Sequence, residues 1–376
     1  MLPSHSAETP RLADVLASSL DSLSGAPNAL DLPGVESAIV VVIDGLGLHN
    51  LQARRGHART LASAMQSKHV ARTTFPATTA AALTSLTTGA QPGEHGVVGY
   101  AVVHPETGLV MNQLTDWGSA MPPTSWQRSP TLFELAADSG LRMNAIGHSK
   151  FSNSGFSQAI LRGTSYHAAD SIAARFQLAA EVAQAPGVSY LYVSELDNMA
   201  HKHGWESNDW LAALETVDAA VAAMLRELDS SVGVLVTADH GVIDVAPYRQ
   251  LELNRVFPDG FADVVAVAGD PRVFTLTLRS GATEIDRSAV AAGWSEALGD
   301  TAWVFTRDQA VSEGLFGAVA DEVLARIPDV FIAARKQVAF YDTRASTPRS
   351  MAMIGQHGSF SDEEVRVPVL RLGGYR

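Results

Sequence analysis

Short apolar runs alternate with amphipathic stretches over most of the chain. Residues 37–43, 187–194 and 231–237 are brief, nearly unbroken apolar runs rich in β-branched residues, which predicts buried strands. Residues 76–88 and 210–228 have the composition and spacing of helices. Strands that alternate with helices build mostly parallel sheets with helices on both faces. The pattern therefore predicts an α/β fold, a three-layer α/β/α sandwich.

The alternation changes character after residue 245. The stretch 246–342 resembles a smaller α+β unit, and the chain then ends in a strand-like run that returns to the main sheet. The first 35 residues are rich in Ser, Pro and Ala and contain one short amphipathic stretch. We therefore predict an N-terminal arm at 1–35, a core formed by 36–245 and 343–376, and an inserted subdomain at 246–342.

Composition and charge narrow the possible partners. Of the 376 residues, 46% are hydrophobic and 18% are charged, which is typical of a globular protein with a sizeable core. The net charge is −13 and no block of Lys and Arg interrupts it, so polymeric nucleic acid is not expected as a partner. A small anionic substrate is compatible with this charge, because bound divalent cations reverse the sign of the local field.

The chain contains no cysteine, which removes disulfides, thiolate zinc sites and a cysteine nucleophile together. Any metal ion must then be held by histidines and carboxylates. The N-terminus lacks the basic start and apolar core of a signal peptide, and no apolar run has the length needed to span a bilayer. We therefore expect a cytoplasmic protein without a membrane partner. No feature of the sequence indicates an oligomeric state.

Acidic residues follow each of the three strongest predicted strands, and histidines lie close to two of them. Ligands of open α/β sheets bind outside the carboxyl ends of the strands, where these carboxylates would meet. They would repel one another strongly unless cations lay between them. Three aspartates and three histidines suit two divalent metal ions with three ligands each, zinc first and manganese as the alternative. The candidate ligands are Asp44, Asp197, His201, Asp239, His240 and His357.

A nucleophile is expected beside the metal ions, just ahead of the predicted helix at 76–88. There the unpaired N–H groups and the dipole of a helix N-terminus favour an anion, and metal coordination would lower the pKa of a hydroxyl. Thr74 is the first candidate and Thr73 its nearest rival, whereas Thr78 and Thr79 are interpreted as residues that start the helix.

Six short motifs span most of the chain and read Asp44-Gly45, Thr74-Phe75-Pro76, Glu94-His95-Gly96-Val97, Asp197-x-x-x-His201-x-x-Gly204, Asp239-His240-Gly241 and His357-Gly358. In this order they resemble the motifs of the nucleotide pyrophosphatase/phosphodiesterase family of the alkaline phosphatase superfamily. The resemblance implies an alkaline-phosphatase-like sandwich with a smaller inserted α+β unit. It also implies a two-metal hydrolase that cleaves a phosphodiester or nucleotide pyrophosphate bond through a phospho-threonine intermediate.

The resemblance also implies a role for each residue. One metal ion would be held by Asp197, His201 and His357, and the other by Asp44, Asp239 and His240, with Thr74 at the second ion. The chain departs from the family pattern where many members have a Lys before the nucleophile and an Asn after Phe-Pro, because Thr73 and Ala77 occupy these places.

Three residues are candidates for binding the small phosphorylated substrate. Many family members place an Asn shortly after the His-Gly motif, where this chain reads Gly99-Tyr100, and the Tyr100 hydroxyl is the candidate donor. Phe75 offers a ring on which a leaving group stacks, against the simpler interpretation of packing. His203 is a substrate-facing candidate, against a solvated loop histidine.

Other chemistries stay open as alternatives. A phosphomonoesterase or phosphonate hydrolase would use the same metal ions, and a monoesterase needs an added cation, for which Arg72 is the nearest candidate. A non-catalytic metal-binding protein is the second alternative. Residues 147–151 begin like a serine-hydrolase elbow but lack its closing glycine. Gly45-Leu46-Gly47 lacks the third glycine of a dinucleotide-binding turn.

Overall fold

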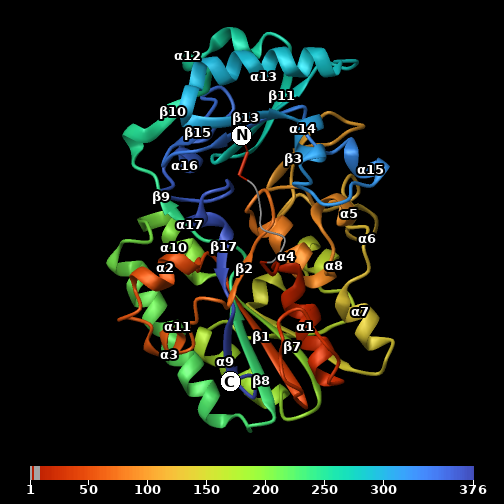
Figure 1. Cartoon of the computed structure of the whole chain (residues 1–376), viewed down its shortest axis with the longest axis vertical. Coiled ribbons are helices and arrows are strands. Elements are labelled where there is room, and N and C mark those ends of the chain that lie inside the picture. The colour runs from red at the N-terminus through yellow and green to blue at the C-terminus, as the bar shows by residue number, and fades with distance from the viewer. Residues whose placement is uncertain (1, 4–8) are drawn as a thin grey trace.

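A six-stranded mixed sheet forms the lower half of the molecule in the computed structural model, which describes residues 2–3 and 9–376 (Figure 1). Its strand order is β18-β8-β1-β7-β5-β6. Five strands are parallel and only the edge strand β18 runs antiparallel, beside β8. The bounds are β1 Ser37–Ile43, β5 Arg142–Gly147, β6 Ser165–Ala168, β7 Gly187–Val193, β8 Val232–Thr237 and β18 Leu370–Gly373.

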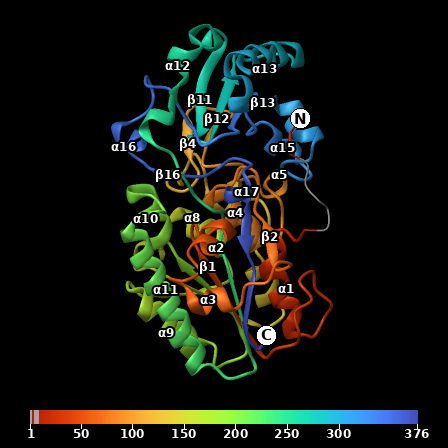
Figure 2. The same cartoon turned by 60° about the vertical axis from the view of Figure 1, so that its left-hand side comes forward.

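Helices cover both faces of this sheet, which confirms the three-layer α/β/α prediction. One face carries α9 (Ile172–Val182) and α11 (Asn208–Glu227), and the other carries α1 (Ala13–Leu23), α4 (Thr79–Thr88) and α7 (Leu132–Ala137). Figure 2 shows α9 and α11 on one side of the strands and α1 on the other. Every residue of β1 and β8 is buried, as expected for central parallel strands covered on both faces.

The upper lobe contains a second, four-stranded antiparallel sheet in the order β11-β12-β14-β13 (Figure 1). The strands are β11 Val264–Asp270, β12 Val273–Leu278, β13 Ala302–Thr306 and β14 Val330–Ala334, and α13 (Glu284–Leu298) packs on them. This sheet has its own small core, in which Trp294 of α13 is fully buried against Leu276 and Ile332. The lobe therefore has an independent packing centre beside the larger core.

Four two-stranded sheets lie around and between the two lobes. They pair β2 (Val70–Arg72) with β17 (Arg366–Pro368), β9 (Ile243–Asp244) with β16 (Gly355–Gln356), β10 (Gln250–Glu252) with β15 (Ala339–Tyr341), and β3 (Ala101–Val103) with β4 (Val110–Asn112). The remaining helices are α2 Leu48–Ala53, α3 Arg59–Ser63, α5 Pro92–His95, α6 Pro123–Trp126, α8 Gly155–Ile160, α10 Glu195–His203, α12 Leu253–Val256, α14 Arg307–Ser312, α15 Asp321–Leu324, α16 Pro348–Met351 and α17 Asp362–Val365.

The division into an arm, a core and an inserted subdomain stays a prediction. Residues 1 and 4–8 of the predicted arm lie outside the described residues, and residues 13–23 form α1, which packs against β1 and α4. The elements of the upper sheet fall between residues 264 and 334, inside the predicted insertion. None of the described helices combines the length and the apolar character that crossing a membrane requires.

Candidate metal centre and active site

The three central strands end in register at one edge of the large sheet. Ile43 of β1 pairs with Val193 of β7, and Val42 pairs with Thr237 of β8. Asp44 therefore leaves β1 beside the start of α10, which carries Asp197 in its first turn, and beside Asp239, two residues past β8. Parallel strands thus deliver three carboxylates to one place, as the sequence pattern predicts.

The six predicted ligands gather in two groups of three. One group is Asp197, His201 and His357, the other is Asp44, Asp239 and His240, and within each group the ligand atoms all lie within 4.8 Å of one another. The groups adjoin, because the rings of His240 and His357 stack with their centroids 3.5 Å apart. The structure thus brings together both ligand sets that the resemblance implies.

The carboxylates of these groups contain buried oxygens that lack a hydrogen-bond partner in the described residues. Asp44 Oδ1, Asp197 Oδ1 and Asp239 Oδ2 are buried without a hydrogen bond from any described residue. Burying such an oxygen unpaired is costly unless a cation compensates it. Three carboxylates and three imidazoles are also a donor set that suits zinc or manganese. The residues present therefore fit two divalent cations.

The electrostatics of the site agree with cation binding. Burial and the charges of Asp239 and Asp197 raise the pKa of Asp44 well above its ordinary value. Burial and the charge of Asp197 also raise the pKa of Asp239. Burial lowers the pKa of His240 to about 4 and that of His357 to about 3. Both imidazoles are then neutral near pH 7 and retain a lone pair for a metal ion.

Backbone carbonyls orient the three histidines. Nδ1 of His201 lies 2.8 Å from the carbonyl oxygen of Gly355, and Nδ1 of His357 lies 2.8 Å from that of Ala77. Nδ1 of His240 lies 3.2 Å from the carbonyl oxygen of Gly241. A carbonyl only accepts, so each Nδ1 donates and each Nε2 is left as the ligand atom, an arrangement common among metal-bound histidines.

Tyr192 is a site residue that the sequence analysis missed. Its hydroxyl donates to Oδ2 of Asp44, so this tyrosine on β7 fixes a carboxylate that follows β1. Gly45 has φ of +73° and its N–H donates to Oδ1 of Asp239 at 3.1 Å. The alternation along β7 offers a signal for Tyr192, because residues spaced by two share one face of a strand.

The predicted nucleophile Thr74 has no hydrogen-bond contact with the six ligands in the described residues, whereas the hydroxyl of Thr79 has one. Helix α4 begins at Thr79 rather than near Pro76, and the Thr79 hydroxyl lies 3.1 Å from Nε2 of His240. The Thr74 hydroxyl instead donates to the carbonyl oxygen of Pro76, and Thr74 lines a cavity that contains none of the six ligands. The hydroxyl that lies both at the N-terminus of α4 and against a predicted ligand is therefore that of Thr79. The roles of Thr74 and of its rival Thr73 stay predictions.

Phe75 is a packing residue, as the simpler of its two interpretations expects, and its ring is not placed as a stacking platform for substrate. Its ring is 5% exposed and stacks on Phe360 with centroids 4.3 Å apart. Three further phenylalanines contact it, at centroid distances of 5.8–5.9 Å: Phe305, Phe316 and Phe331. The ring therefore joins the loop ahead of α4 to the upper lobe.

The two other predicted substrate residues lie outside the ligand groups. Tyr100 is 38% exposed and precedes β3, which packs on β11 of the upper sheet. His203 ends α10, where its Nδ1 lies 3.5 Å from Oδ2 of Asp209. This surface ion pair resembles the solvated-histidine alternative, and both substrate roles stay predictions.

Asp270 brings the upper lobe against the site and was also missed. It ends β11, and a Cβ placed on Gly358 would lie 2.3 Å from its Oδ1, so the residue after His357 must be a glycine for the two to approach. Burial raises the pKa of Asp270 to about 7. Its Oδ2 is buried and accepts no hydrogen bond from the described part of the chain. Sequence offers no signal for this contact, because it depends on how the lobes pack.

Residues 38–360 match the family model described as Type I phosphodiesterase / nucleotide pyrophosphatase. With this match, the fold and the paired ligand groups support a metal-dependent phosphoryl hydrolase with an alkaline-phosphatase-like architecture. The chain belongs to this family, which confirms the resemblance noted from its motifs. No curated protein sequence matches the chain significantly.

Several solved structures share the fold. Murine ectonucleotide pyrophosphatase/phosphodiesterase 5 is 16% identical with a TM-score of 0.69, and the match covers 89% of this chain and 88% of that one. Phosphonoacetate hydrolase from Sinorhizobium meliloti 1021, in complex with phosphonoformate, is 18% identical with a TM-score of 0.69 and coverages of 90% and 91%. At these identities the likeness extends to the fold alone.

Proposed function

We propose that the protein hydrolyses a phosphodiester or nucleotide pyrophosphate bond through a phosphorylated Thr79. The observation that carries this proposal is the contact between the Thr79 hydroxyl and Nε2 of His240, at the N-terminus of α4 and beside the group formed by Asp44, Asp239 and His240. No other threonine hydroxyl in the described residues contacts one of the six predicted ligands through a hydrogen bond.

Each part of the chain has a defined task in this reaction. Asp197, His201 and His357 would hold one cation, and Asp44, Asp239 and His240 would hold the other. The two cations supply charge neutralisation and activation of a hydroxyl or water. Tyr192 keeps the Asp44 carboxylate in place through its hydrogen bond.

Thr79 performs the covalent step. Its oxygen attacks phosphorus in line, the bond from phosphorus to the leaving oxygen breaks, and the hydroxyl proton passes to solvent or to the leaving group. Water then attacks the phosphorylated threonine and restores the hydroxyl. The first-turn N–H groups and the dipole of the ten-residue α4 favour the anionic phosphoryl group at this place.

Related structures support the choice of substrate class and of a threonine. One structure of the murine relative is described as an inactive threonine-to-alanine variant in complex with AMP. The phosphonoacetate hydrolase structures contain phosphonoformate and phosphonoacetate, which makes a phosphonate hydrolase the competing activity. Both activities require the same two ligand groups, so the substrate must be assigned by turnover.

The test compares Thr79→Ala with Thr74→Ala in zinc- and manganese-loaded protein. Thr79→Ala is expected to lower kcat by at least about a thousandfold because the nucleophile is lost, with metal content unchanged by elemental analysis. Thr74→Ala is the matched control and should stay within a few-fold of the parent. Full activity of Thr79→Ala, or loss only in Thr74→Ala, would remove Thr79 from this role.

The substrate class is tested on the parent protein. Turnover of bis-p-nitrophenyl phosphate and a nucleoside pyrophosphate is expected to exceed that of p-nitrophenyl phosphate and phosphonoacetate. Faster hydrolysis of phosphonoacetate would assign a phosphonate hydrolase, and faster hydrolysis of p-nitrophenyl phosphate a monoesterase. Bound metal without turnover of any of the four would favour a non-catalytic metal-binding protein.

A further inference from the structure

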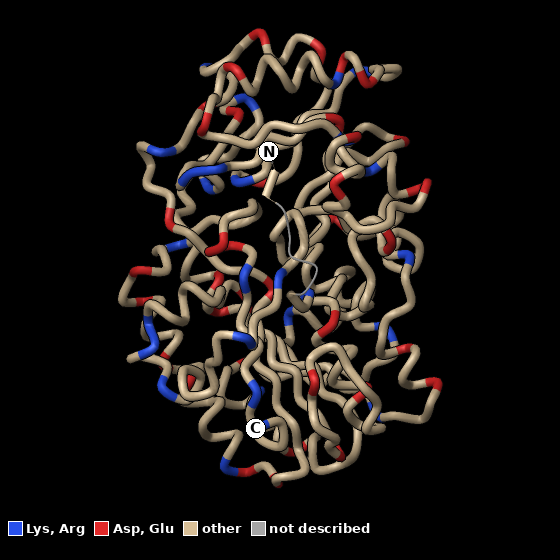
Figure 3. The backbone as a smooth tube through the Cα atoms, in the orientation of Figure 1, with Lys and Arg blue, Asp and Glu red and all other residues tan. Residues whose placement is uncertain are grey.

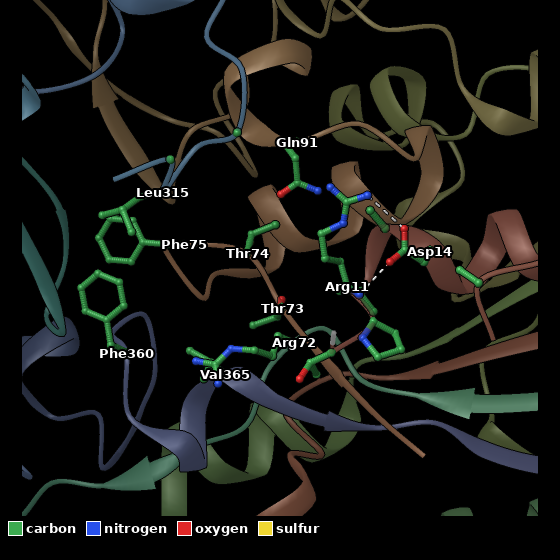
Figure 4. Close-up of a pocket in the computed structure, with 17 residues that line it drawn as sticks. Arg11, Asp14, Arg72, Thr73, Thr74, Phe75, Gln91, Leu315, Phe360 and Val365 are labelled. Atoms are coloured by element: carbon green, nitrogen blue, oxygen red, sulfur yellow. Dashed lines mark hydrogen bonds and ion pairs between the residues drawn. The ribbon is translucent and has the colours of Figure 1, made fainter. Parts of the chain in front are cut away.

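A cavity of about 630 Å³ lies between the N-terminal segment, β2 and the loop after α14 (Figure 4). Neither Thr79 nor any of the six predicted ligands lines it. Its volume falls within the range typical of small-molecule sites. A second cavity of about 420 Å³ adjoins it, because both are lined by Thr9, Pro10 and Arg72. Arg72, a sequence candidate for binding a monoester, therefore belongs to these cavities.

Three arginines lie in a row across neighbouring backbone segments at these cavities. Arg72 of β2 forms an isolated parallel bridge with Arg11, and it stands directly opposite Arg366 in the antiparallel pair of β2 and β17. Lys68 lines the second cavity beside them. Like charges at opposed strand positions destabilise a sheet. The row of arginines therefore lowers the local stability, and such a local cost is typical of a functional site.

Carboxylates neutralise this row only in part. Asp14 pairs with Arg11 at 3.2 Å, and Asp362 lies 3.8 Å from both Arg72 and Arg366 with its side chain 68% exposed. Four cationic side chains thus face two carboxylates, in a chain whose net charge is −13. In Figure 3 basic positions gather where β2 and β17 lie, near the centre of the view. The local field attracts anions although the whole protein repels them.

The larger cavity offers both polar and apolar walls. Figure 4 shows Arg11 and Gln91 on one side and Phe75 and Leu315 on the other. The Thr73 hydroxyl in this lining is buried and has no hydrogen-bond partner within the described residues. Guanidinium groups and a hydroxyl are common ligands of phosphoryl oxygens, and the phenylalanine and leucine suit an apolar or aromatic substituent.

We propose that this cavity is a second ligand site, separate from the metal centre, for a small organic anion that carries a phosphate or phosphonate group beside an apolar part. Arg72 binds the anionic oxygens, Thr73 donates its hydroxyl to one of them, and the apolar wall packs on the rest of the ligand. Arg11, which Figure 4 shows turned toward Asp14 and Gln91, adds to the local positive field. The site does not depend on the hydrolytic activity proposed above, since the two share no residue.

The test is calorimetric titration of the zinc-loaded full chain with phenylphosphonate. Wild-type protein is expected to bind phenylphosphonate at a site whose affinity Arg72→Gln lowers at least about tenfold. This is the loss expected when a charge-assisted hydrogen bond is removed. Arg55→Gln is the matched control, because Arg55 is exposed and lines neither cavity. The same class should weaken as sodium chloride is raised, and methylphosphonate should bind more weakly than phenylphosphonate.

Asp239→Asn separates this site from the metal centre. The phenylphosphonate binding that Arg72→Gln weakens should persist in the Asp239→Asn variant, whether or not phenylphosphonate also binds at the metal centre. The proposal would be overturned if Asp239→Asn abolished this binding, or if Arg72→Gln weakened no phenylphosphonate binding at all. Thr73→Val preserves every charge and serves if Arg72→Gln lowers the melting temperature. Unchanged binding by a folded Thr73→Val would then contradict the site.

Discussion

The carboxyl-terminal edge of the large sheet and the packed junction with the upper lobe differ in whether their buried charged groups are hydrogen-bonded to each other. At the sheet edge, Asp44, Asp197 and Asp239 each bury an oxygen without a hydrogen bond from the described residues. At the junction, Arg272 and Glu364 are fully buried but bind each other through two hydrogen bonds of 3.0 and 2.7 Å. The unpaired region is the one that can bind cations, and the paired region holds the lobes together.

Breaking the paired region should have one of the two largest effects on stability. Glu364→Gln leaves the buried Arg272 charge unpaired and should lower the free energy of unfolding by about 3–5 kcal/mol, measured by urea denaturation. The exposed pair of Arg279 and Asp263 provides the control, and Asp263→Asn should change little. Equal effects of the two variants would show that the junction does not depend on this ion pair.

The same ion pair predicts how the stability of the folded protein changes with pH. Burial acts to raise the pKa of Glu364, but the Arg272 charge and the hydrogen bonds outweigh it and lower the pKa from 4.5. A carboxylate whose folded pKa is depressed stabilises the protein above its unfolded pKa, and this contribution is lost as the pH falls through the folded value. The advantage of the parent over Glu364→Gln should therefore shrink below pH 4.5.

Phe75→Ala tests whether packing at the junction is separate from chemistry. Removing this buried ring should cost about 3–5 kcal/mol of unfolding free energy, as for other core phenylalanines. Turnover by the folded fraction should stay within a few-fold, because Phe75 packs on other phenylalanines rather than on substrate. A large rise in KM with unchanged stability would restore its predicted role as a stacking platform.

Tyr192→Phe tests the unpaired region while preserving the ring. Loss of the hydrogen bond to Asp44 should weaken metal binding by about 10–100-fold, as measured by competition with a chelator. The free energy of unfolding at saturating metal should change much less than the metal affinity. An unchanged metal affinity would mean that Asp44 holds its orientation without Tyr192.

The smallest effect concerns the metal-free protein. Burial and neighbouring carboxylates raise the pKa of Asp44 above 3.8, so its ionisation opposes folding. A raised folded pKa contributes stability at low pH that is lost as the pH rises through the folded value. After chelation, Asp44→Asn should therefore stabilise the protein above pH 3.8 by about 1 kcal/mol or more. If metal-free Asp44→Asn unfolded more easily than metal-free parent, carboxylate repulsion would not be the cause.

Much of the core could be predicted from apolar patterning. The predicted strand at 37–43 matches β1, and those at 187–194 and 231–237 match β7 and β8 to within one residue at an end. All three are buried central strands, for which a continuous apolar run is a direct signal. The grouping of the six candidate ligands, which the family resemblance implied, also agrees with the structure.

The start of α4 could not be predicted in the same way. Pro76 suits a first-turn position, yet the helix begins three residues later, where Thr78 adopts the extended N-cap conformation. Local propensity permits both starts, and the choice depends on long-range contacts such as the hydrogen bond from Ala77 N–H to the Gly358 carbonyl. Asp270 was missed for the same reason, and the packing partners of Phe75 could not be predicted, since both depend on how the upper lobe packs on the core.

The chain order of the ligands has a consequence for how the two halves move. Asp44, Asp197, His201, Asp239 and His240 all precede the upper sheet in the chain, whereas His357 follows it. A cation bound by Asp197, His201 and His357 would therefore link the segment that follows the upper sheet to helix α10, which precedes it. Metal loading would then restrict hinge motion of the whole lobe, and proteolysis or hydrogen exchange in the connecting segments would report whether the metal is bound.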